Sequence, residues 1–407
     1  MKNTGFKPLN DSDKNKRGSE LESLLHSEHS LTIEKLIVGG DGLGRLTFNE
    51  KSLVVFVPES APGDKLKIKI TRAEKNHLKG EIIEILEPSP HRRPAPCEYY
   101  KNCGGCSLQH ITESQQILQK ELILKDLLAK FISGTEFKLL PTIQSENNFH
   151  YRNRIQLKFD GKSFGYFKKA SHQIVDINHC PIADKRISDA IPDVKKKLKP
   201  ATEVVRYELR LNHLEQFEFY KIGEDGEGLS FSQVNNSVNS KLIDQVCQLV
   251  KGCKPTEATE LYAGAGNFSF PLMKAVPGLK MESVELNSKL TEFAVKNVVQ
   301  SNLQKRLTFF TTDCESFVKR RELSKEFVIL DPPRVGCSKP VMDAICNRLP
   351  QTILYISCHP VNLARDLSLL LKADPTYRIE HLQIFDMFPQ TDHFETLVLL
   401  KRESRID

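Results

Sequence analysis

Apolar and polar residues alternate in short runs over the first part of the chain. Between Leu31 and Pro88, runs such as KLKIKI and EIIEIL follow the two-residue period of a β-strand, and turns rich in glycine separate them. About five such strands predict a small OB-like β-barrel over residues 31–90. Residues 1–30 are polar and have no apolar period, so we expect a mobile tail there.

The pattern changes to longer units over residues 229–407. Apolar strand-like runs such as ATELYAG and EFVILDPP alternate there with helical segments. This alternation is typical of βαβ units and predicts a doubly wound, Rossmann-like parallel sheet. The whole chain is therefore expected to be a multidomain α/β protein.

Residues 91–228 lie between these two patterns and predict a central α+β domain. A helical period begins near Glu113, and this helical part, near residues 109–140, is a candidate to pack on the last domain. Between Arg152 and Lys199, twelve Lys/Arg outnumber five Asp/Glu, with aromatic residues interleaved. This mixture suits single-stranded RNA, because cations neutralise phosphates and aromatic rings stack on bases. A solvated face over a sheet core accounts for the same composition equally well.

Composition narrows the class of protein further. The chain has 407 residues, a net charge of +6, and no stretch near the roughly 20 apolar residues of a membrane helix. Its N-terminus lacks the apolar segment of a signal peptide, so we expect a cytoplasmic protein with no membrane partner. Ten cysteines in such a protein favour metal binding, catalysis or core thiols over a disulfide framework. We expect the protein to be a monomer.

A glycine-containing turn follows the strand-like run ATEL. Gly264 and Gly266 would let the backbone approach a ligand closely, although a tight structural turn is the plainer interpretation. Glu285 ends the next strand and is placed to bind two ribose hydroxyls. Phe268 and Ser269 occupy the region of the third glycine in the G-x-G-x-x-G pattern. This departure argues against NAD and favours S-adenosylmethionine.

Two further strand ends carry carboxylates. Asp313 could bond an adenine amino group, and a helix N-cap is an equally good interpretation. Asp331 opens the segment Asp331-Pro-Pro-Arg334 after the run EFVIL. Prolines stiffen a loop at the edge where ligands bind in open α/β sheets.

A nucleophile and a base are candidates at the last two strands. Cys358 follows the run TILYIS in a rigid loop, which suits a nucleophile, although a lone cysteine is more often a core thiol. Glu395 precedes the strand-like run LVLL and is the available base. An exposed loop carboxylate is the alternative for Glu395.

Several of these segments together closely resemble the RNA uracil-C5 methyltransferase family. They occur in the family's order, and the resemblance covers nearly all of the chain after the tail. Residues 31–88 also resemble a TRAM domain, an RNA-binding barrel at the front of some members. The matching segments are FSQVN (residues 231–235), LYAGAGNF, LDPPRVG, ISCHPVNLARDL and DHFET.

The resemblance implies a role for each matching residue. Cys358 would be the nucleophile and Glu395 the proton acceptor. His359 departs from the Asn or Asp of many relatives, and the segment from Gly264 to Asn267 is more variable in the family. The positions implied to bind S-adenosylmethionine are Gln233, Tyr262, Asn267, Glu285, Asp313 and Asp331.

Uracil chemistry explains why both groups are needed. C5 of uracil is a poor nucleophile toward a methyl sulfonium. Addition of a thiolate at C6 makes an enolate whose C5 can take the methyl group, and a base must then remove the C5 proton. A stacked base cannot be reached from both faces, so the target uridine must be flipped out.

A cysteine cluster lies in the central region. Cys97, Cys103 and Cys106 form a C-x5-C-x2-C run, and Cys180 could supply a fourth ligand. Four thiolates can hold zinc or a [4Fe–4S] cluster, and spacing alone does not separate the two. The run matches the iron–sulfur motif of the methyltransferase family, so the resemblance implies a [4Fe–4S] cluster with a structural role.

The choice of RNA rests on the same resemblance. Family members with both an iron–sulfur motif and a TRAM-like domain mostly act on large-subunit rRNA, so 23S rRNA is the expected partner. A tRNA uracil-C5 methyltransferase is an alternative. A non-enzymatic iron–sulfur RNA-binding protein is another, but it would have no use for both Cys358 and Glu395.

Overall fold

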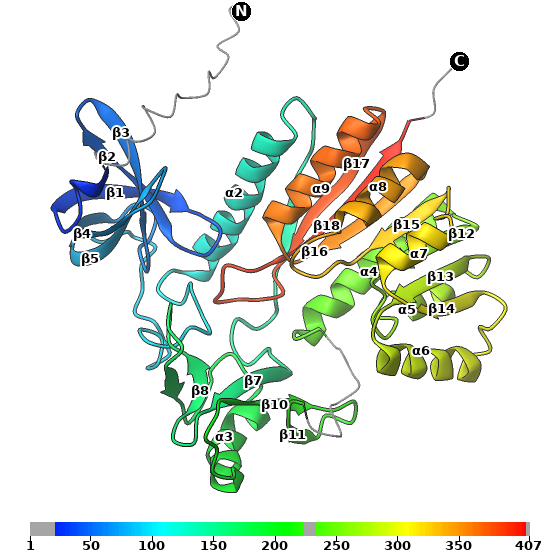
Figure 1. The fold of residues 1–407 in the computed structure, drawn as a ribbon, viewed down its shortest axis with the longest axis horizontal. Helices are drawn as coiled ribbons and strands as arrows, with labels where there is room; N and C mark the ends of the chain where they lie inside the picture. Colours follow the sequence, from blue (N-terminus) through cyan, green and yellow to red (C-terminus); the bar gives the residue numbers. More distant parts are fainter. Residues whose placement is uncertain (1–20, 224–232, 404–407) are drawn as a thin grey trace, which may run out of the picture. The chain divides into compact units, whose positions relative to one another are not determined.

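The computed structural model describes residues 21–223 and 233–403, and the chain divides into two compact units (Figure 1). Unit 1 comprises Met1–Tyr100 and Cys106–Gln119, and unit 2 comprises Lys101–Gly105 and Lys120–Asp407. Each unit has a hydrophobic core of its own.

Unit 1 contains a closed barrel of five strands in the order β1-β2-β3-β5-β4. Side chains alternate between the barrel interior and its surface, and on β4 the interior residues Leu66, Ile68 and Ile70 are fully buried. The predicted barrel is therefore confirmed. Its strands are β1 (Glu28–Leu36), β2 (Gly42–Phe48), β3 (Lys51–Val57), β4 (Lys65–Ala73) and β5 (Leu78–Glu87).

The boundary predicted for the tail is wrong at its C-terminal end. Leu21 and Leu24 are buried in the barrel core, and β1 begins at Glu28, before residue 30. Two leucines in a polar segment carry no periodic signal, so their burial depends on contacts with distant strands. Residues 1–20 of the predicted tail lie outside the described residues.

A buried carboxylate fastens the segment after the barrel. Asp64 accepts hydrogen bonds from the backbone N–H groups of Ala61 at 2.6 Å and Ser89 at 2.8 Å, and it pairs with Arg92 at 2.6 Å. Burial opposes the charged form, but these hydrogen bonds outweigh it and lower the pKa of Asp64. The proline-rich segment is thus tied to the barrel at Arg92.

Unit 2 is built on an eight-stranded sheet in the order β14-β13-β12-β15-β16-β18-β17-β6. The strand order reverses between β12 and β15, which is where ligands bind in sheets of this kind. The predicted α/β fold is confirmed, with β18 running antiparallel between β16 and β17. The strands are β12 (Glu257–Leu261), β13 (Lys280–Glu285), β14 (Leu307–Thr311), β15 (Phe327–Leu330), β16 (Thr352–Ser357), β17 (Tyr377–Phe385), β18 (Glu395–Arg402) and β6 (Leu140–Ile143).

Helices with apolar stripes cover this sheet. On α4, Val238, Leu242, Val246 and Val250 recur every four residues and are buried against sheet residues such as Ile329. The helices are α4 (Asn236–Cys253), α5 (Ser269–Ala275), α6 (Ser288–Gln300), α7 (Cys314–Arg320), α8 (Lys339–Arg348) and α9 (Pro360–Ala373).

A second sheet in unit 2 is antiparallel, with five strands in the order β11-β10-β7-β8-β9. Helix α3 (Lys185–Lys197) buries Ile187, Ile191 and Val194 beside it. None of the helices in residues 21–223 and 233–403 has the length and apolar character needed to cross a bilayer. The strands are β7 (Arg154–Phe159), β8 (Phe164–Phe167), β9 (Ile174–Asp176), β10 (Val205–Leu211) and β11 (Phe217–Lys221).

Part of the predicted central segment joins the eight-stranded sheet. Strand β6 pairs in parallel with β17, so residues 140–143 do not belong to a separate central domain. On helix α2 (Glu113–Phe131), Lys120 is fully buried and donates to Asp386 Oδ1 at 2.6 Å and to the carbonyl oxygen of Phe388 at 3.2 Å. Sequence pattern alone does not reveal a pairing across such a chain separation.

Lys120→Met is expected to destabilise unit 2 by about 3–5 kcal/mol, because it leaves the buried carboxylate of Asp386 without its partner. Urea denaturation followed by circular dichroism measures the change. Lys125→Met, at an exposed position of the same helix, is the matched control. A loss no larger than that of the control would contradict a role for the buried pair.

Candidate active site

The candidate catalytic residues come from adjacent strands at one edge of the eight-stranded sheet. Strand β16 ends at Ser357, directly before Cys358. Strand β18 runs antiparallel to β16, so it begins at the edge where β16 ends, and Ser357 pairs with Thr396. The register therefore places Cys358 and Glu395 at the same edge.

The turn after β12 leaves room for a ligand. Tyr262 and Gly264 have φ angles of 66° and 57°, and a side chain built on Gly264 would meet nothing within 4 Å. Gly264 donates its N–H to Glu285 Oε2 at 2.9 Å, and Asn287 donates to Oε1 at 2.8 Å. Each carboxylate oxygen keeps a further lone pair for ligand hydroxyl groups.

Two other predicted cofactor residues have local partners. Asp313 accepts from the backbone N–H of Ser316 at 2.7 Å and caps α7, and this hydrogen bond lowers the pKa of Asp313. The N-cap interpretation is thus observed, and the second carboxylate oxygen remains for a ligand. The Asn267 side chain bonds to that of Asn239 on α4, at 3.1 and 3.2 Å.

The remaining predicted cofactor residue, Gln233, lies just before α4. Its side chain is buried, and its carbonyl oxygen accepts from Asn153 Nδ2 at 2.9 Å. Phe231 and Ser232 of the same motif, and the predicted domain start at residue 229, lie outside the described residues.

Asp331 lies at the reversal point of the sheet, beside a second acid. Burial, and then the charge of Glu260, raise the pKa of Asp331 to about 7. Glu260, only 1% exposed, bonds to the hydroxyl groups of Ser269 and Ser283, and burial raises its pKa to about 7. Glu260 was not among the predicted site residues; its signal is a charged residue inside the apolar run ATELY.

Cys358 is partly buried, in the neighbourhood of two carboxyl groups. Burial raises the pKa of its thiol to about 12, and negative charge on Glu395 and Asp331 acts in the same direction. Arg334 opposes the shift. This raised pKa favours the thiol form of Cys358, and charge around it decides how readily a thiolate forms.

Glu395 is 4% exposed, so the exposed-carboxylate alternative is wrong. Its Oε2 atom is buried and has no hydrogen-bond partner among the described residues. Burial, and then the charge of Asp331, raise the pKa of Glu395 well above its usual value, while Arg334 opposes the shift. A buried carboxyl group with an uncommitted oxygen can accept a proton from a substrate.

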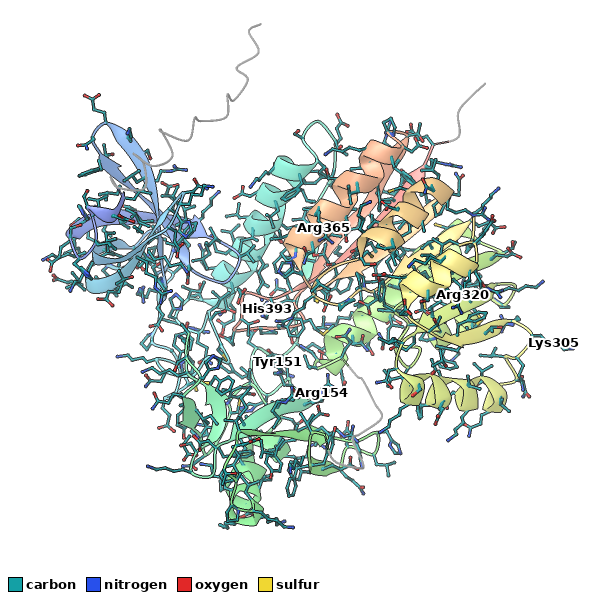
Figure 2. The ribbon with its side chains drawn as sticks, viewed as in Figure 1. Tyr151, Arg154, Lys305, Arg320, Arg365 and His393 are labelled. Carbon is teal, nitrogen blue, oxygen red and sulfur yellow. The ribbon has the colours of Figure 1, made fainter. Side chains whose placement is uncertain are left out.

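Arg334 is the cation of this site. It lowers the pKa values of His359 and His393 in addition to acting on Cys358 and Glu395, with burial as the largest cause for both histidines. Asn362 Nδ2 holds the carbonyl oxygen of Arg334 at 2.6 Å. The sequence motif gave us no role for this residue. Figure 2 labels His393 on the loop before β18 and Arg365 on α9.

Comparison with known proteins identifies the family. Residues 194–403 match the family described as tRNA (Uracil-5-)-methyltransferase, and residues 26–83 match the TRAM domain. The chain belongs to the tRNA (uracil-5-)-methyltransferase family. The predicted activity, methylation of uracil C5 in RNA, and the predicted TRAM barrel are thereby confirmed.

Relatives of this methyltransferase span its length. An uncharacterized RNA methyltransferase of Bdellovibrio bacteriovorus is 39% identical, with 96% of this chain and 99% of the relative covered. The 23S rRNA (uracil(1939)-C(5))-methyltransferase RlmD of Vibrio cholerae is 28% identical, with 94% and 98% covered. The crystal structure of the Pyrococcus abyssi tRNA (uracil-54, C5)-methyltransferase in complex with S-adenosyl-L-homocysteine has a TM-score of 0.66 and 25% identity, with 91% and 100% covered.

The four cysteines predicted to bind a cluster belong to both units of this methyltransferase. Cys97 and Cys106 lie in unit 1, and Cys103 and Cys180 lie in unit 2. None of the four forms a disulfide, and Gly105 donates its N–H to Cys103 Sγ at 3.4 Å. Within residues 21–223 and 233–403, no three His, Cys, Asp or Glu side chains lie close enough to hold a metal ion.

Alkylation of the Cys358 thiol tests how the charge of Glu395 affects the pKa of this thiol. Glu395→Gln removes a negative charge that raises the pKa of Cys358, so the iodoacetamide profile of this thiol is expected to move to lower pH. Mass spectrometry of the Cys358 peptide, after alkylation at a series of pH values, measures this pH profile. Cys346, whose pKa is raised by burial and then by Asp343 and Asp366, is the internal control. An unchanged Cys358 profile would contradict the assigned coupling.

Proposed function

We propose that this protein methylates C5 of a uridine in 23S rRNA, with S-adenosylmethionine as methyl donor. The observation that carries the mechanism is the edge where Cys358 and Glu395 lie on adjacent strands, with Glu395 Oε2 buried and uncommitted. The RlmD proteins of Vibrio cholerae and Shewanella support the choice of RNA, since each matches more than 90% of both chains.

The glycine turn and the neighbouring strand ends fit the donor. The open space over Gly264 leaves room for its backbone to approach a ligand, and Glu285 is placed to bind ribose hydroxyls. Asn267, Asp313, Tyr262 and the buried Gln233 complete the proposed set, together with Asp331 at the reversal point. The bound donor supplies an electrophilic methyl group.

Cys358 starts the proposed reaction. Its sulfur forms a bond to C6 of the uracil, and the C5=C6 π electrons move to C5, which then takes the methyl group. The thiol must lose its proton first, and the guanidinium of Arg334 favours the thiolate. Because attack at C6 needs access to a face of the ring, the target uridine is proposed to be flipped out of its stack.

Glu395 completes the reaction. Its carboxylate takes the proton from C5, the C5=C6 bond forms again, and the sulfur–C6 bond breaks to release the thiolate. The raised pKa of Glu395 gives this carboxylate a higher proton affinity than a solvated glutamate has.

A tRNA substrate is the second candidate, and one observation favours it. The Pyrococcus abyssi enzyme that matches this chain is named for a tRNA uridine. Mass spectrometry of 23S rRNA and tRNA from a deletion strain separates the two. Loss of 5-methyluridine from 23S rRNA alone is expected, and loss from tRNA alone would overturn the proposed substrate.

We also propose that the protein is cytoplasmic and monomeric.

We further propose that Cys97, Cys103, Cys106 and Cys180 hold a [4Fe–4S] cluster. Four cysteines outside any disulfide are a suitable donor set, and backbone N–H groups that donate to sulfur are known to tune such clusters. No step above needs an electron, so the proposed role is structural.

Glu395→Gln is expected to trap the enzyme on its substrate. The amide can pack in place of the carboxyl group but cannot accept the C5 proton, so methylation proceeds and release stalls. A denaturation-resistant protein–RNA band that carries labelled methyl is the expected result. Addition of Cys358→Ala should abolish the band. A well-folded Glu395→Gln protein with normal turnover and no band would remove Glu395 from the mechanism.

Cys103→Ser is expected to remove the brown absorbance and iron of anaerobically purified protein. Cys253→Ser, at a half-buried cysteine on α4, is the control and should keep both. Stoichiometric zinc without iron in the parent protein would show that the cluster assignment is wrong.

A further inference from the structure

A cavity in unit 2, of about 440 Å³, is lined by residues of the five-stranded antiparallel sheet, here called the central sheet, and of the start of α4. Its size is within the range of about 300–1,000 Å³ that is usual for ligand pockets. Asparagine is the most frequent residue type in its lining. The asparagines that line it are Asn147, Asn153, Asn212, Asn235 and Asn236.

The arginine of this amide pocket is paired with two carboxylates, so these three side chains carry a net negative charge. Arg186 pairs with Asp184 at 2.9 Å and with Glu215 at 3.2 Å. The guanidinium is therefore committed to carboxylates. An isolated phosphate group would lack a free cation here, whereas a neutral polar ring would meet amides.

Asn153, a lining residue of the pocket, has one acceptor atom that is buried and unpaired. Its side chain is 8% exposed, and its Nδ2 donates to the carbonyl oxygen of Gln233 at 2.9 Å and to Asn236 Oδ1 at 2.5 Å. A carbonyl oxygen can only accept, so Nδ2 must face Gln233 and the amide cannot be reversed. The Oδ1 atom of Asn153 has no hydrogen-bond partner in the described part of the chain.

Asn236 presents the complementary group. Its Oδ1 accepts from Asn153, so its Nδ2 is left to donate elsewhere. Asn236 is exposed at the first turn of α4. The two linked amides thus offer an acceptor and a donor next to each other.

We propose that this pocket binds an adenine or cytosine of the RNA substrate, close to the target uridine. The exocyclic amino group would donate to Asn153 Oδ1, and the neighbouring ring nitrogen would accept from Asn236 Nδ2. The Watson–Crick edges of uracil and guanine carry a carbonyl oxygen beside an N–H, so these bases would have to enter with the ring turned over to meet the same two groups. This inference rests on the proposed function, because it assumes an RNA substrate.

The position of the pocket explains why the base would be close to the target. Tyr151, another lining residue, donates its hydroxyl group to the carbonyl oxygen of Pro389 at 3.0 Å. Pro389 lies on the loop that leads through His393 to Glu395. Figure 2 shows Tyr151 between this loop and the central sheet, where Arg154 lies. Tyr151 therefore both lines the pocket and contacts the loop that leads to Glu395.

The test uses fluorescent RNA that carries the target uridine, taken from whichever RNA the protein methylates. Each nearby adenosine or cytidine is replaced in turn by its analogue without the amino group, and dissociation constants are measured by anisotropy on the full chain. One position is expected to lose about tenfold in affinity, which corresponds to about 1.4 kcal/mol for an unmade hydrogen bond.

Asn236→Asp tests the assignment because it replaces the hydrogen-bond donor of Asn236 with an acceptor. The aspartate can still accept from Asn153, but it turns an oxygen outward in place of the donor. Parental RNA should bind about tenfold more weakly, and guanosine at the sensitive position should restore binding, because its N1–H and amino group are two donors. An acid in the first turn of α4 also suits the helix dipole, so the variant should fold.

Asn347→Ala, at an exposed asparagine of α8, is the control and should bind like the parent. The absence of any sensitive position would overturn the pocket assignment, as would a sensitive position that responds equally in parent and Asn236→Asp. Methyl transfer is measured on the same RNAs. Normal transfer without a sensitive position would reject the pocket alone, whereas a parent protein that methylates no uracil would reject the proposed function.

Discussion

The proposed active site depends on a carboxyl group that is buried and has one oxygen without a hydrogen-bond partner among the described residues. Glu395 is almost inaccessible to solvent, and one of its oxygens forms no hydrogen bond with the described residues. An ionised carboxylate in such a place is costly, so burial moves the equilibrium toward the protonated form. In the proposed mechanism, the same burial raises the affinity of this carboxylate for the proton on C5.

The fold produces this arrangement through strand direction. A parallel strand in place of β18 would begin at the opposite edge of the sheet, far from Cys358. The antiparallel pairing of β18 with β16 brings the two residues to one edge, and the buried pair between Lys120 and Asp386 holds the end of β17 that precedes the loop. Arg334 then supplies the positive charge that opposes the effect of burial on both reactive groups.

Sequence patterns could predict features that depend on local periodicity. The two-residue period of β4 predicted the barrel, and the alternation of strands and helices predicted the parallel sheet. Features that depend on contacts between distant parts of the chain could not be predicted from these patterns. Leu21 and β6 show no periodic signal, because their positions depend on partners far along the chain.

The candidate site also has features that the sequence predicts and features that it does not. Cys358 and Glu395 could be named from motifs, but a motif carries no information about burial. The exposed-loop interpretation of Glu395 failed because the strand register that buries it is tertiary. Glu260 was missed since a single acid in an apolar strand is ordinarily assigned to solvent.

The central claim is that the Cys358 sulfur adds to C6 whereas the Glu395 carboxylate removes the proton from C5. Tritium at C5 of the target uridine tests this claim most directly. In a single turnover, the parent protein should release one tritium to water for each methyl group transferred. Glu395→Gln should transfer the methyl group to RNA while tritium release falls far behind. Release that keeps pace with methyl transfer in Glu395→Gln would contradict the account, because another group would then be removing the C5 proton.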